Sequence, residues 1–437
     1  MKKSLIALGV LAALANVARA EDASVQLYGI LDLAVATQNQ SKSASDSFPV
    51  SIDNNSTSNN FNGLGSFTGM TNGGLSDSRW GIQGKYALDN GLTATFQLES
   101  GFNLPTGQSN NGALSQAIGK NSSSANPITN VDSSLSGQLF NRTAHVGLMS
   151  KELGSIDFGR NYGVGYDVIG GYDPQKGSQL FSPLGFSGSE GGALGYTELL
   201  RNDNSVKYSN KINGVTLRAI YKFGNQAGKN TVGSGYGVNV GYETGMFGVQ
   251  AAYSAYTDAL ATSGAVYSAT NPQGVAGTLY NTEGYVVAAK YTNKALNLKA
   301  GYEQYKRKAA SDSAASIGSL SEFGYTFAYS TSSTALNNLT AYTGVDKVYT
   351  LYWVGGDYMV TDKLNVAMAY YNVGYNAAAG VSNGTATQNF YSAVLDYNLS
   401  KKTDTYAGVM YQTDSFQTAG VANPTITTFA VGLRHKF

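Results

Sequence analysis

Alternation between apolar and polar residues runs through the chain after residue 20, and no sustained helical periodicity appears there. Successive side chains of a strand point to opposite faces, so a period of two predicts β-strands. Sixteen such stretches can be distinguished. They cover residues 24–38, 76–88, 91–103, 138–150, 154–160, 204–212, 215–224, 235–244, 246–257, 282–292, 296–307, 347–360, 364–375, 388–399, 403–416 and 425–437.

Seven tight turns alternate strictly with eight longer connections between these strands. Asn213-Gly214 is the strongest hairpin signal, because both residues tolerate positive φ. An even number of strands with short turns at one end and long loops at the other is typical of a bacterial outer-membrane barrel. The two chain ends then lie at one rim, where the strand from Val25 can pair with the strand that ends at Phe437. Closure is required because lipid cannot satisfy an open sheet edge.

The two faces of the strands differ in polarity. In residues 215–223 one parity is apolar, whereas the other carries Thr216, Arg218 and Lys222. A soluble sandwich also alternates but buries its apolar face, so alternation alone leaves both folds open. Charged residues make up 13 % of the chain, against about 25 % in soluble domains, and 31 Tyr accompany only 7 Pro. Tyrosine suits a membrane boundary, and scarce proline suits unbroken strands, so composition favours an all-β transmembrane antiparallel barrel.

Residues 1–20 have the pattern of a secretory signal peptide. Lys2 and Lys3 precede an apolar run, and Ala18-Arg19-Ala20 resembles a cleavage site. The run is too short for a spanning helix, although an uncleaved anchor is the alternative. Removing the three basic residues of this leader from the 29 in the chain leaves 26 against 28 acidic residues, a net charge of about −2. This balance excludes the basic footprint of nucleic-acid binding, and the lack of cysteine excludes disulfides and thiolate metal sites.

The expected organisation is therefore a signal peptide over 1–20 and one barrel domain over 21–437. Within the barrel, residues 161–203 leave the alternating pattern. A structureless loop of this length inside a compact chain is usually either functional or a sign of a wrong element assignment. We expect this segment to fold inward and narrow a channel.

Four segments carry distinctive motifs, namely 78–81 (SRWG), 140–148 (FNRTAHVGL), 154–164 (GSIDFGRNYGV) and 204–208 (NSVKY). They resemble motifs of a known family, the sixteen-stranded trimeric general porins of Gram-negative outer membranes. The last two resemble the start and end of the family's inward-folded third loop. The terminal Phe437 is also typical of the family.

This resemblance implies a passive, water-filled channel for ions and small hydrophilic solutes, without a cofactor. It also implies a homotrimer surrounded by outer-membrane lipid and lipopolysaccharide. Insertion by the barrel-assembly machinery through Phe437 is a further implication.

The resemblance also implies a constriction in which wall bases face loop acids. The wall bases are Arg79, Arg142 and Arg201, and the loop acids are Asp167 and Asp173. Weaker expectations for the lumen lining are Lys85, Arg160, Arg218, Arg434, Glu190 and Glu198. Ile30 stands where some members of the family have a wall lysine. Arg142 shares the parity of Val146 and Leu148, so periodicity aims it outward, whereas the resemblance aims it inward.

Three alternatives remain beside a general channel. A hydrolase would need a nucleophile and a base, but His145 and His435, the only histidines, are both expected on the apolar face of strands. A sugar- or anion-selective channel is a second alternative. An aromatic slide for sugars would use third-loop residues, namely Tyr162, Tyr166, Tyr172, Phe181 and Phe186. Adhesion or phage reception by exterior loops is the third.

Overall fold

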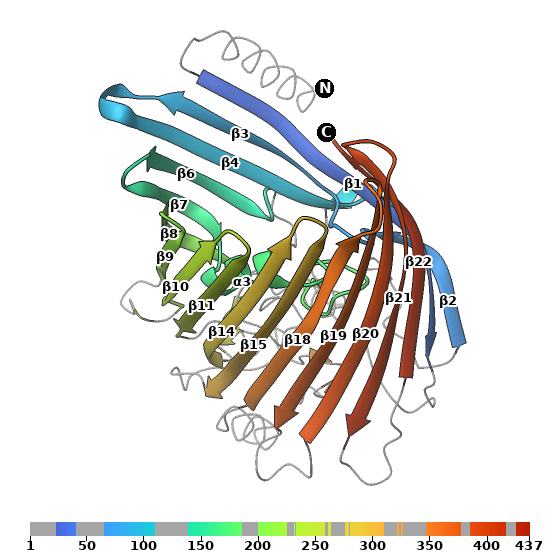
Figure 1. Cartoon of the computed structure of the whole chain (residues 1–437). Helices are drawn as coiled ribbons and strands as arrows, with labels where there is room; N and C mark the ends of the chain where they lie inside the picture. Colours follow the sequence, from blue (N-terminus) through green and yellow to red (C-terminus); the bar gives the residue numbers. More distant parts are fainter. Residues whose placement is uncertain are drawn as a thin grey trace, which may run out of the picture.

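The computed structural model describes residues 23–40, 65–109, 139–185, 200–224, 231, 233–257, 261–263, 276–278, 280–309, 321–322, 325–326, 347–376, 385–416 and 425–437. The main sheet has 18 strands, of which sixteen pair in a closed antiparallel circuit (Figure 1). The barrel prediction is thus confirmed. The signal peptide expected at 1–20 lies outside the described residues.

The barrel strands follow one another around the circuit in chain order. They are β1 (Ala23–Gln40), β3 (Arg79–Ala87), β4 (Leu92–Asn103), β6 (Thr143–Ser150), β7 (Gly154–Tyr162), β8 (Arg201–Ile212), β9 (Val215–Lys222), β10 (Gly235–Thr244), β11 (Phe247–Tyr256), β14 (Tyr280–Asn293), β15 (Leu296–Ala309), β18 (Lys347–Met359), β19 (Leu364–Asn376), β20 (Thr385–Asn398), β21 (Thr403–Phe416) and β22 (Thr425–Lys436). The smaller elements are β2 (Gly65–Asn72), the 3-10 turn η1 (Asp89–Gly91), β5 (Gln108–Ser109), α3 (Val164–Tyr172), β12 (Ala261–Ser263), β13 (Ala276–Thr278), β16 (Ser321–Glu322) and β17 (Tyr325–Thr326).

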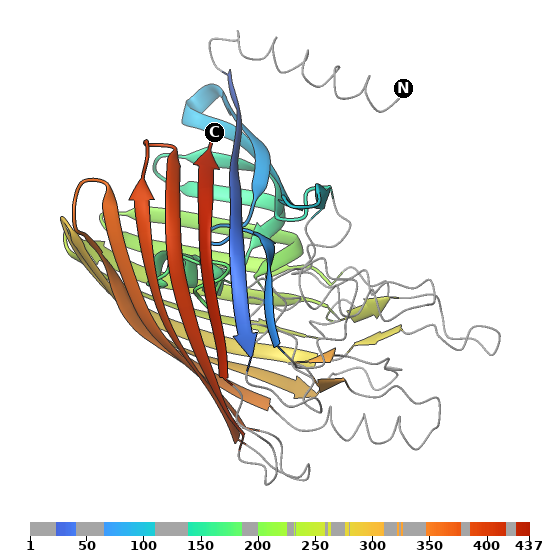
Figure 2. The same ribbon diagram turned by 90° about the vertical axis from the view of Figure 1, so that its right-hand side faces the viewer.

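The first and last strands close the barrel. β1 pairs with β22 from Ile30↔Lys436 to Gln40↔Ile426, and its first half pairs with β3. Figure 2 shows the blue β1 beside the red β22. Gly29 and Phe437 exchange backbone hydrogen bonds of 3.3 and 3.1 Å at the rim. The seam therefore joins β22 to β1 from Ile30 to Gln40, as a closed barrel in lipid requires.

The tight turns gather at the rim that holds the C-terminus (Figure 1). Asn213 and Gly214 both have positive φ, 51° and 83°, as the hairpin signal predicts. Asn90 and Gly91 repeat this conformation, with φ of 62° and 74°.

Alternation divides each strand into a lipid face and a lumen face. On β10, Val238 and Val240 are exposed on the outside, whereas Asn239 between them is fully buried on the inside. The same outward exposure recurs in Phe429, Val431 and Leu433 of β22. An exposed apolar band of this kind is stable only against hydrocarbon. Among the described helices, none is both long and apolar enough to span a membrane.

The elements β2 and α3 were not predicted, and neither were the two- and three-residue strands β5, β12, β13, β16 and β17. β2 pairs with the second half of β1, from Leu33↔Asn72 to Gln40↔Gly65, although its sequence lies in a stretch assigned to loop. α3 lies in the segment 161–203, where no helix was expected. That segment also carries more apolar packing than anticipated, because Val164, Val168 and Phe181 are fully buried.

Candidate functional site: the lumen constriction

The described part of the third loop, residues 163–185, runs along the inner face of the barrel. α3 lies within the ring of strands (Figure 1) and packs on β10, β11 and β14. Two wall glycines make room for this packing. A Cβ on Gly237 would lie 2.6 Å from Val164, and one on Gly408 would lie 2.6 Å from Phe181. The loop is therefore seated in hollows that the wall sequence provides.

Directional bonds fix the end of α3 on the wall. The indole Nε1 of Trp353 donates to the carbonyl O of Tyr172 at 2.9 Å. The Tyr172 hydroxyl donates to Glu243 Oε1 at 3.1 Å. Burial, and next the negative charge of Glu243, raise the pKa of Tyr172, so that this donor stays protonated.

Asp173 organises the turn that follows α3. Its carboxylate accepts the backbone N–H groups of Gln175 (3.1 Å) and Gly177 (2.7 Å) and the hydroxyl of Tyr371 (2.5 Å). Lys299 Nζ donates to the Asp173 carbonyl at 2.9 Å. The side chain is fully buried. Asp173 therefore holds the turn against the wall and does not present an open charge to the lumen.

Asp167, in the first turn of α3, lies close to two basic side chains of the wall. Its Oδ2 lies 2.6 Å from Lys207 Nζ and 3.7 Å from Arg218 Nε. Arg218 also donates to Asn239 Oδ1 at 2.9 Å. This places Arg218 on the lumen face, where the sequence predicted it.

Arg142 is held from two sides. Its Nε lies 2.6 Å from Glu99 Oε1, and its Nη1 lies 2.6 Å from Asp77 Oδ2. Asn141 fixes the backbone beside it by accepting the Gly101 N–H and donating to the Gly101 carbonyl. Arg142 precedes the first residue of β6, so the parity of that strand does not govern it. The side chain points inward, as the resemblance implied and periodicity did not.

The other two wall arginines lie around the same acids and tyrosines. Arg79 Nε is 3.6 Å from Glu99 Oε2, and its side chain is 25 % exposed. Arg201 is buried, with its guanidinium carbon 5.1 Å from the ring centre of Tyr162. The Tyr162 and Tyr166 rings stack 4.7 Å apart. The structure thus brings the predicted wall bases into one cluster.

The residues that were weaker expectations for the lumen lining lie in different surroundings. Lys85 is exposed near the rim on the same strand face as Arg79. Arg160 is buried beside a register irregularity of β7 and pairs with Asp203 and the Asn141 carbonyl. Arg434 lies on the lumen face between Asp404 (3.0 Å) and Asp396 (3.4 Å). Glu190 and Glu198 fall outside the described residues.

Sequence reasoning missed several charged partners. Glu243 lies 2.6 Å from Lys211 and 2.5 Å from Lys290. Asp357 lies 3.3 Å from Lys176. Glu243 and Lys211 share the polar parity of their strands, so alternation could have found them, whereas Asp357 shares its parity with Leu351 and Trp353. Their mutual pairing depends on three-dimensional position, which alternation does not give.

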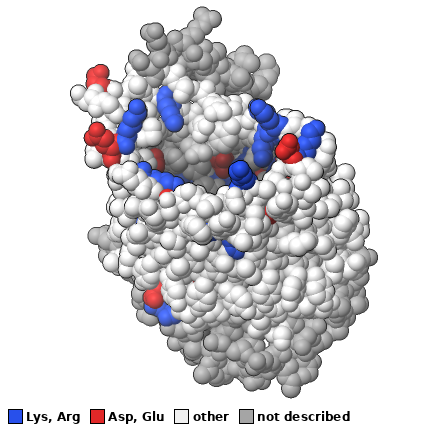
Figure 3. Space-filling view, in the orientation of Figure 1, with Lys and Arg blue, Asp and Glu red and all other residues white. Residues whose placement is uncertain are grey.

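The exposed fraction of the side chain differs between the two partners of several ion pairs. The side chain of Lys176 is 58 % exposed, whereas that of its partner Asp357 is 2 % exposed. The side chain of Lys211 is 54 % exposed, whereas that of its partner Glu243 is 21 % exposed. Figure 3 shows a hollow whose rim carries Lys and Arg with fewer acids beside them. Lys176 and Lys211 thus reach water more than their acids do, whereas Asp203 (36 %) and Asp396 (23 %) are more exposed than their partners Arg160 (7 %) and Arg434 (14 %).

The expected placement of His145 was wrong. His145 has the parity opposite to the exposed Val146 and Leu148, and its Nε2 lies 3.9 Å from Asp157 on the inner face. His435 is exposed on the lipid-face parity of β22, as predicted. Within the described ranges, no group of three or more His, Cys, Asp or Glu could hold a metal ion.

Two of the five aromatic residues considered for a sugar slide are buried in packing. Tyr172 and Phe181 lie between the loop and the wall. Tyr162 and Tyr166 stack beneath Arg201, and Phe186 lies outside the described residues. Tyr172 and Phe181 therefore stabilise the loop by packing against the wall.

A closed barrel with an apolar exterior, a charged interior and a loop seated inside defines a membrane channel of the porin class. The family model described as Gram-negative porin matches residues 7–417. The chain belongs to this family, and its place is the Gram-negative outer membrane.

Known relatives agree with this assignment. The chain is 34 % identical over 174 residues to an outer membrane porin protein of Bordetella pertussis, covering 40 % of this chain and 37 % of that protein. It is 30 % identical over 199 residues to outer membrane porin F of Escherichia coli, covering 44 % and 46 %. The chain thus spans less than half the length of these curated relatives.

Solved structures match over almost the whole length. An anion-selective porin from Comamonas acidovorans has a TM-score of 0.61 at 20 % identity, covering 95 % of this chain and all of that chain. OmpT of Vibrio cholerae has a TM-score of 0.58 at 14 % identity, covering 96 % and 99 %. At these identities the likeness shows the fold.

Proposed function

We propose that the chain forms a passive, water-filled channel for ions and small hydrophilic solutes, narrowed by the loop at 161–203. The observation that carries this proposal is the inversion of polarity across the barrel wall. Charged and amide groups such as Arg218 and Asn239 face the lumen, while Val238 and Val240 face outward. A chain inserted in lipid with such an interior encloses water.

The constriction favours polar solutes by its electrostatics. Arg79, Arg142 and Arg201 stand on one wall, and the loop bears Asp167. Fixed charges on opposite sides of a narrow water column orient dipolar solutes, whereas apolar solutes must displace ordered water. The guanidinium group of arginine stays charged at physiological pH.

A preference for anions within this channel is supported by the exposure of the lumen charges. Lys176, Lys211 and Arg79 reach water more than Asp173, Asp357 and Glu99 do. The potential that an anion meets beside these three bases is then favourable. A solved structure with the same fold is named an anion-selective porin, which is consistent with this preference. The burial of Tyr172 and Phe181 makes a sugar-specific slide the weaker candidate.

The proposed partners follow from family membership. Trimers occur among the solved neighbours, including a trimer form of OmpT from Vibrio cholerae, and we expect a homotrimer here. We also expect lipid and lipopolysaccharide around the barrel and assembly through Phe437. Residues 1–20 are proposed to be removed on export.

A reversal potential across a planar bilayer under a KCl gradient tests the filter. The wild type is expected to favour chloride, and Arg79→Gln, Arg142→Gln and Arg201→Gln together should shift permeability toward potassium. Lys151→Gln, Lys401→Gln and Lys402→Gln together remove the same charge from exposed turns and serve as the control. An unchanged potential in the arginine variant would exclude these residues from the filter. Saturable block of the current by sugars would favour a sugar-selective channel.

A further inference from the structure

The connector 73–78, between β2 and β3, is held inside the barrel by Asp32 of β1. The backbone N–H groups of Gly74, Leu75 and Ser76 donate to the Asp32 carboxylate at 3.1, 3.1 and 2.7 Å. Three successive N–H groups that converge on one carboxylate form an anion-binding nest. Asp32 is fully buried, so the nest is filled by a side chain of the barrel itself.

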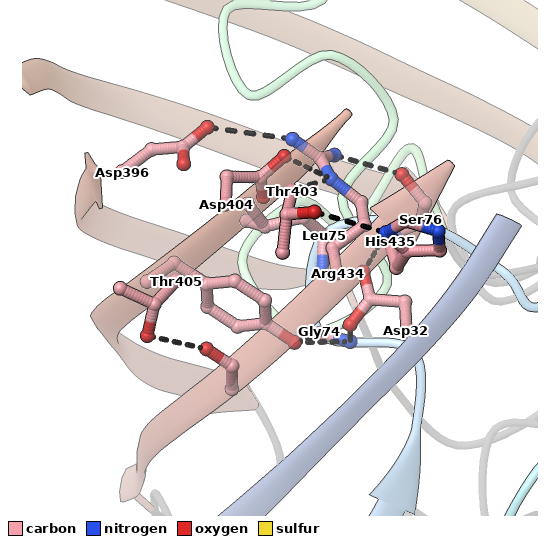
Figure 4. Close-up of polar contacts among 12 residues, drawn as sticks. Asp32, Gly74, Leu75, Ser76, Asp396, Thr403, Asp404, Thr405, Arg434 and His435 are labelled. Carbon is pink, nitrogen blue, oxygen red and sulfur yellow. Dashed lines mark hydrogen bonds and ion pairs between the residues drawn. The ribbon is translucent and has the colours of Figure 1, made fainter. Parts of the chain in front are cut away.

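Further bonds restrict the connector around Asp32 (Figure 4). The Tyr406 hydroxyl donates to Asp32 Oδ1 and accepts the Gly74 N–H at 3.0 Å. The Ser78 hydroxyl donates to the Asp32 carbonyl and accepts the Asp32 N–H, both at 3.0 Å. Arg434 donates to Ser76 Oγ at 2.9 Å. The connector is therefore fixed from β1, β21 and β22.

The same connector contacts both sides of the constriction. The Gly74 carbonyl accepts the Ser178 hydroxyl at 2.7 Å and the Leu180 N–H at 3.0 Å, which ties down the third loop. Three residues further on, Asp77 pairs with Arg142 of the basic wall at 2.6 Å. One short segment thus joins the loop to the wall bases.

We infer that Asp32 is a positioning residue that sets the width of the constriction through this connector. The carboxylate fixes Gly74 and Ser76, Gly74 fixes the loop, and Asp77 fixes Arg142. The inference rests on the proposed channel function, since it assigns a role within that channel. It adds a residue on β1 that lies outside the predicted wall and loop charges.

Asp32→Asn tests this role with little change of shape. The amide NH2 group cannot accept hydrogen bonds from the backbone N–H groups. The variant therefore keeps one acceptor oxygen where the wild type has two. The expected result is a loosened loop and a higher entry rate of a trisaccharide relative to a pentose in liposome-swelling assays, by several-fold over wild type. Ser178→Ala, which removes the loop side of the same link, should change this ratio in the same direction. Asp362→Asn, which makes the same exchange in the exposed turn between β18 and β19, should leave the ratio unchanged.

The outcomes separate the inference from the channel proposal. Wild-type protein that admits neither sugar would refute the channel itself. A conducting wild type with an unchanged sugar ratio in Asp32→Asn would overturn the inference alone, even if that variant lost heat stability, because a purely structural role lowers stability without changing size selection. If Asp32→Asn failed to insert into the membrane, an unchanged sugar ratio in Ser178→Ala would also overturn the inference.

Discussion

Lys207 on β8 and Asp167 in the first turn of α3 form an ion pair of 2.6 Å. Lys207 Nζ also donates to the carbonyl O of Tyr162, at the end of β7, at 2.9 Å. One wall lysine therefore holds the start of the third loop twice. Its positive charge also compensates the negative charge of the Asp167 carboxylate.

Lys207→Gln should shift ion preference toward cations. The substitution leaves Asp167 with Arg218 at 3.7 Å as its remaining ion-pair partner, so that the lumen gains net negative charge. Reversal potentials under a salt gradient measure the shift. Lys151→Gln removes a lysine in the turn between β6 and β7 and is the matched control. Equal potentials in the two variants would contradict the assignment of Lys207 to the lumen field.

Arg142→Met should destabilise the folded barrel by about 3–5 kcal/mol, because it leaves buried carboxylates without their cation. Glu99 and Asp77 are the groups affected, with side-chain exposures of 8 % and 5 %. Arg79→Met removes a more exposed partner of Glu99 and should cost at most about 1 kcal/mol. Urea unfolding in lipid vesicles measures both changes. Comparable losses would show that Arg142 is not the central cation of the cluster.

Tyr371→Phe should loosen the turn after α3, because it removes one donor to the buried Asp173 carboxylate. Hydrogen bonds to charged groups contribute about 1.5–3 kcal/mol. Protease cleavage within 173–185 should therefore accelerate while the barrel remains folded. Tyr370→Phe is the control on the same strand, since that hydroxyl donates to Asn389 at 2.8 Å. Equal cleavage rates in the two variants would show that the Tyr371 hydroxyl does not stabilise the turn.

Val240→Arg should lower the stability of the inserted barrel by about 2–4 kcal/mol, as expected for a cation placed against lipid near mid-depth. Val240 is 55 % exposed on β10. Gln83→Arg adds the same side chain on the lumen face of β3 and should be nearly neutral. Unfolding in vesicles measures the stability of both variants. A larger loss in Gln83→Arg than in Val240→Arg would contradict the assignment of the lipid and lumen faces.

The sequence predicted most barrel strands closely because each is a long, regular repeat of period two. The predicted 235–244 coincides with β10 (Gly235–Thr244), and 425–437 differs from β22 (Thr425–Lys436) by one residue. β2 was missed because Gly65–Asn72 is rich in glycine and polar residues on both parities. Its strand state depends on pairing with β1, which no local pattern encodes.

The site could be predicted only in part. Arg79, Arg142 and Arg201 were found through motif resemblance and do lie in one cluster. α3 was missed because it is short and carries two adjacent glycines, Gly170 and Gly171, and its stability comes from packing on the wall. Burial of Asp173 was missed because the sequence does not show that the Gln175 and Gly177 N–H groups and Tyr371 surround it.

Single-channel recording of the wild-type protein in planar bilayers tests the central claim most directly. A water-filled barrel predicts stepwise, ohmic current increments whose size rises in proportion to the bulk salt concentration. Folded, membrane-inserted protein that gave no such increments would contradict the account.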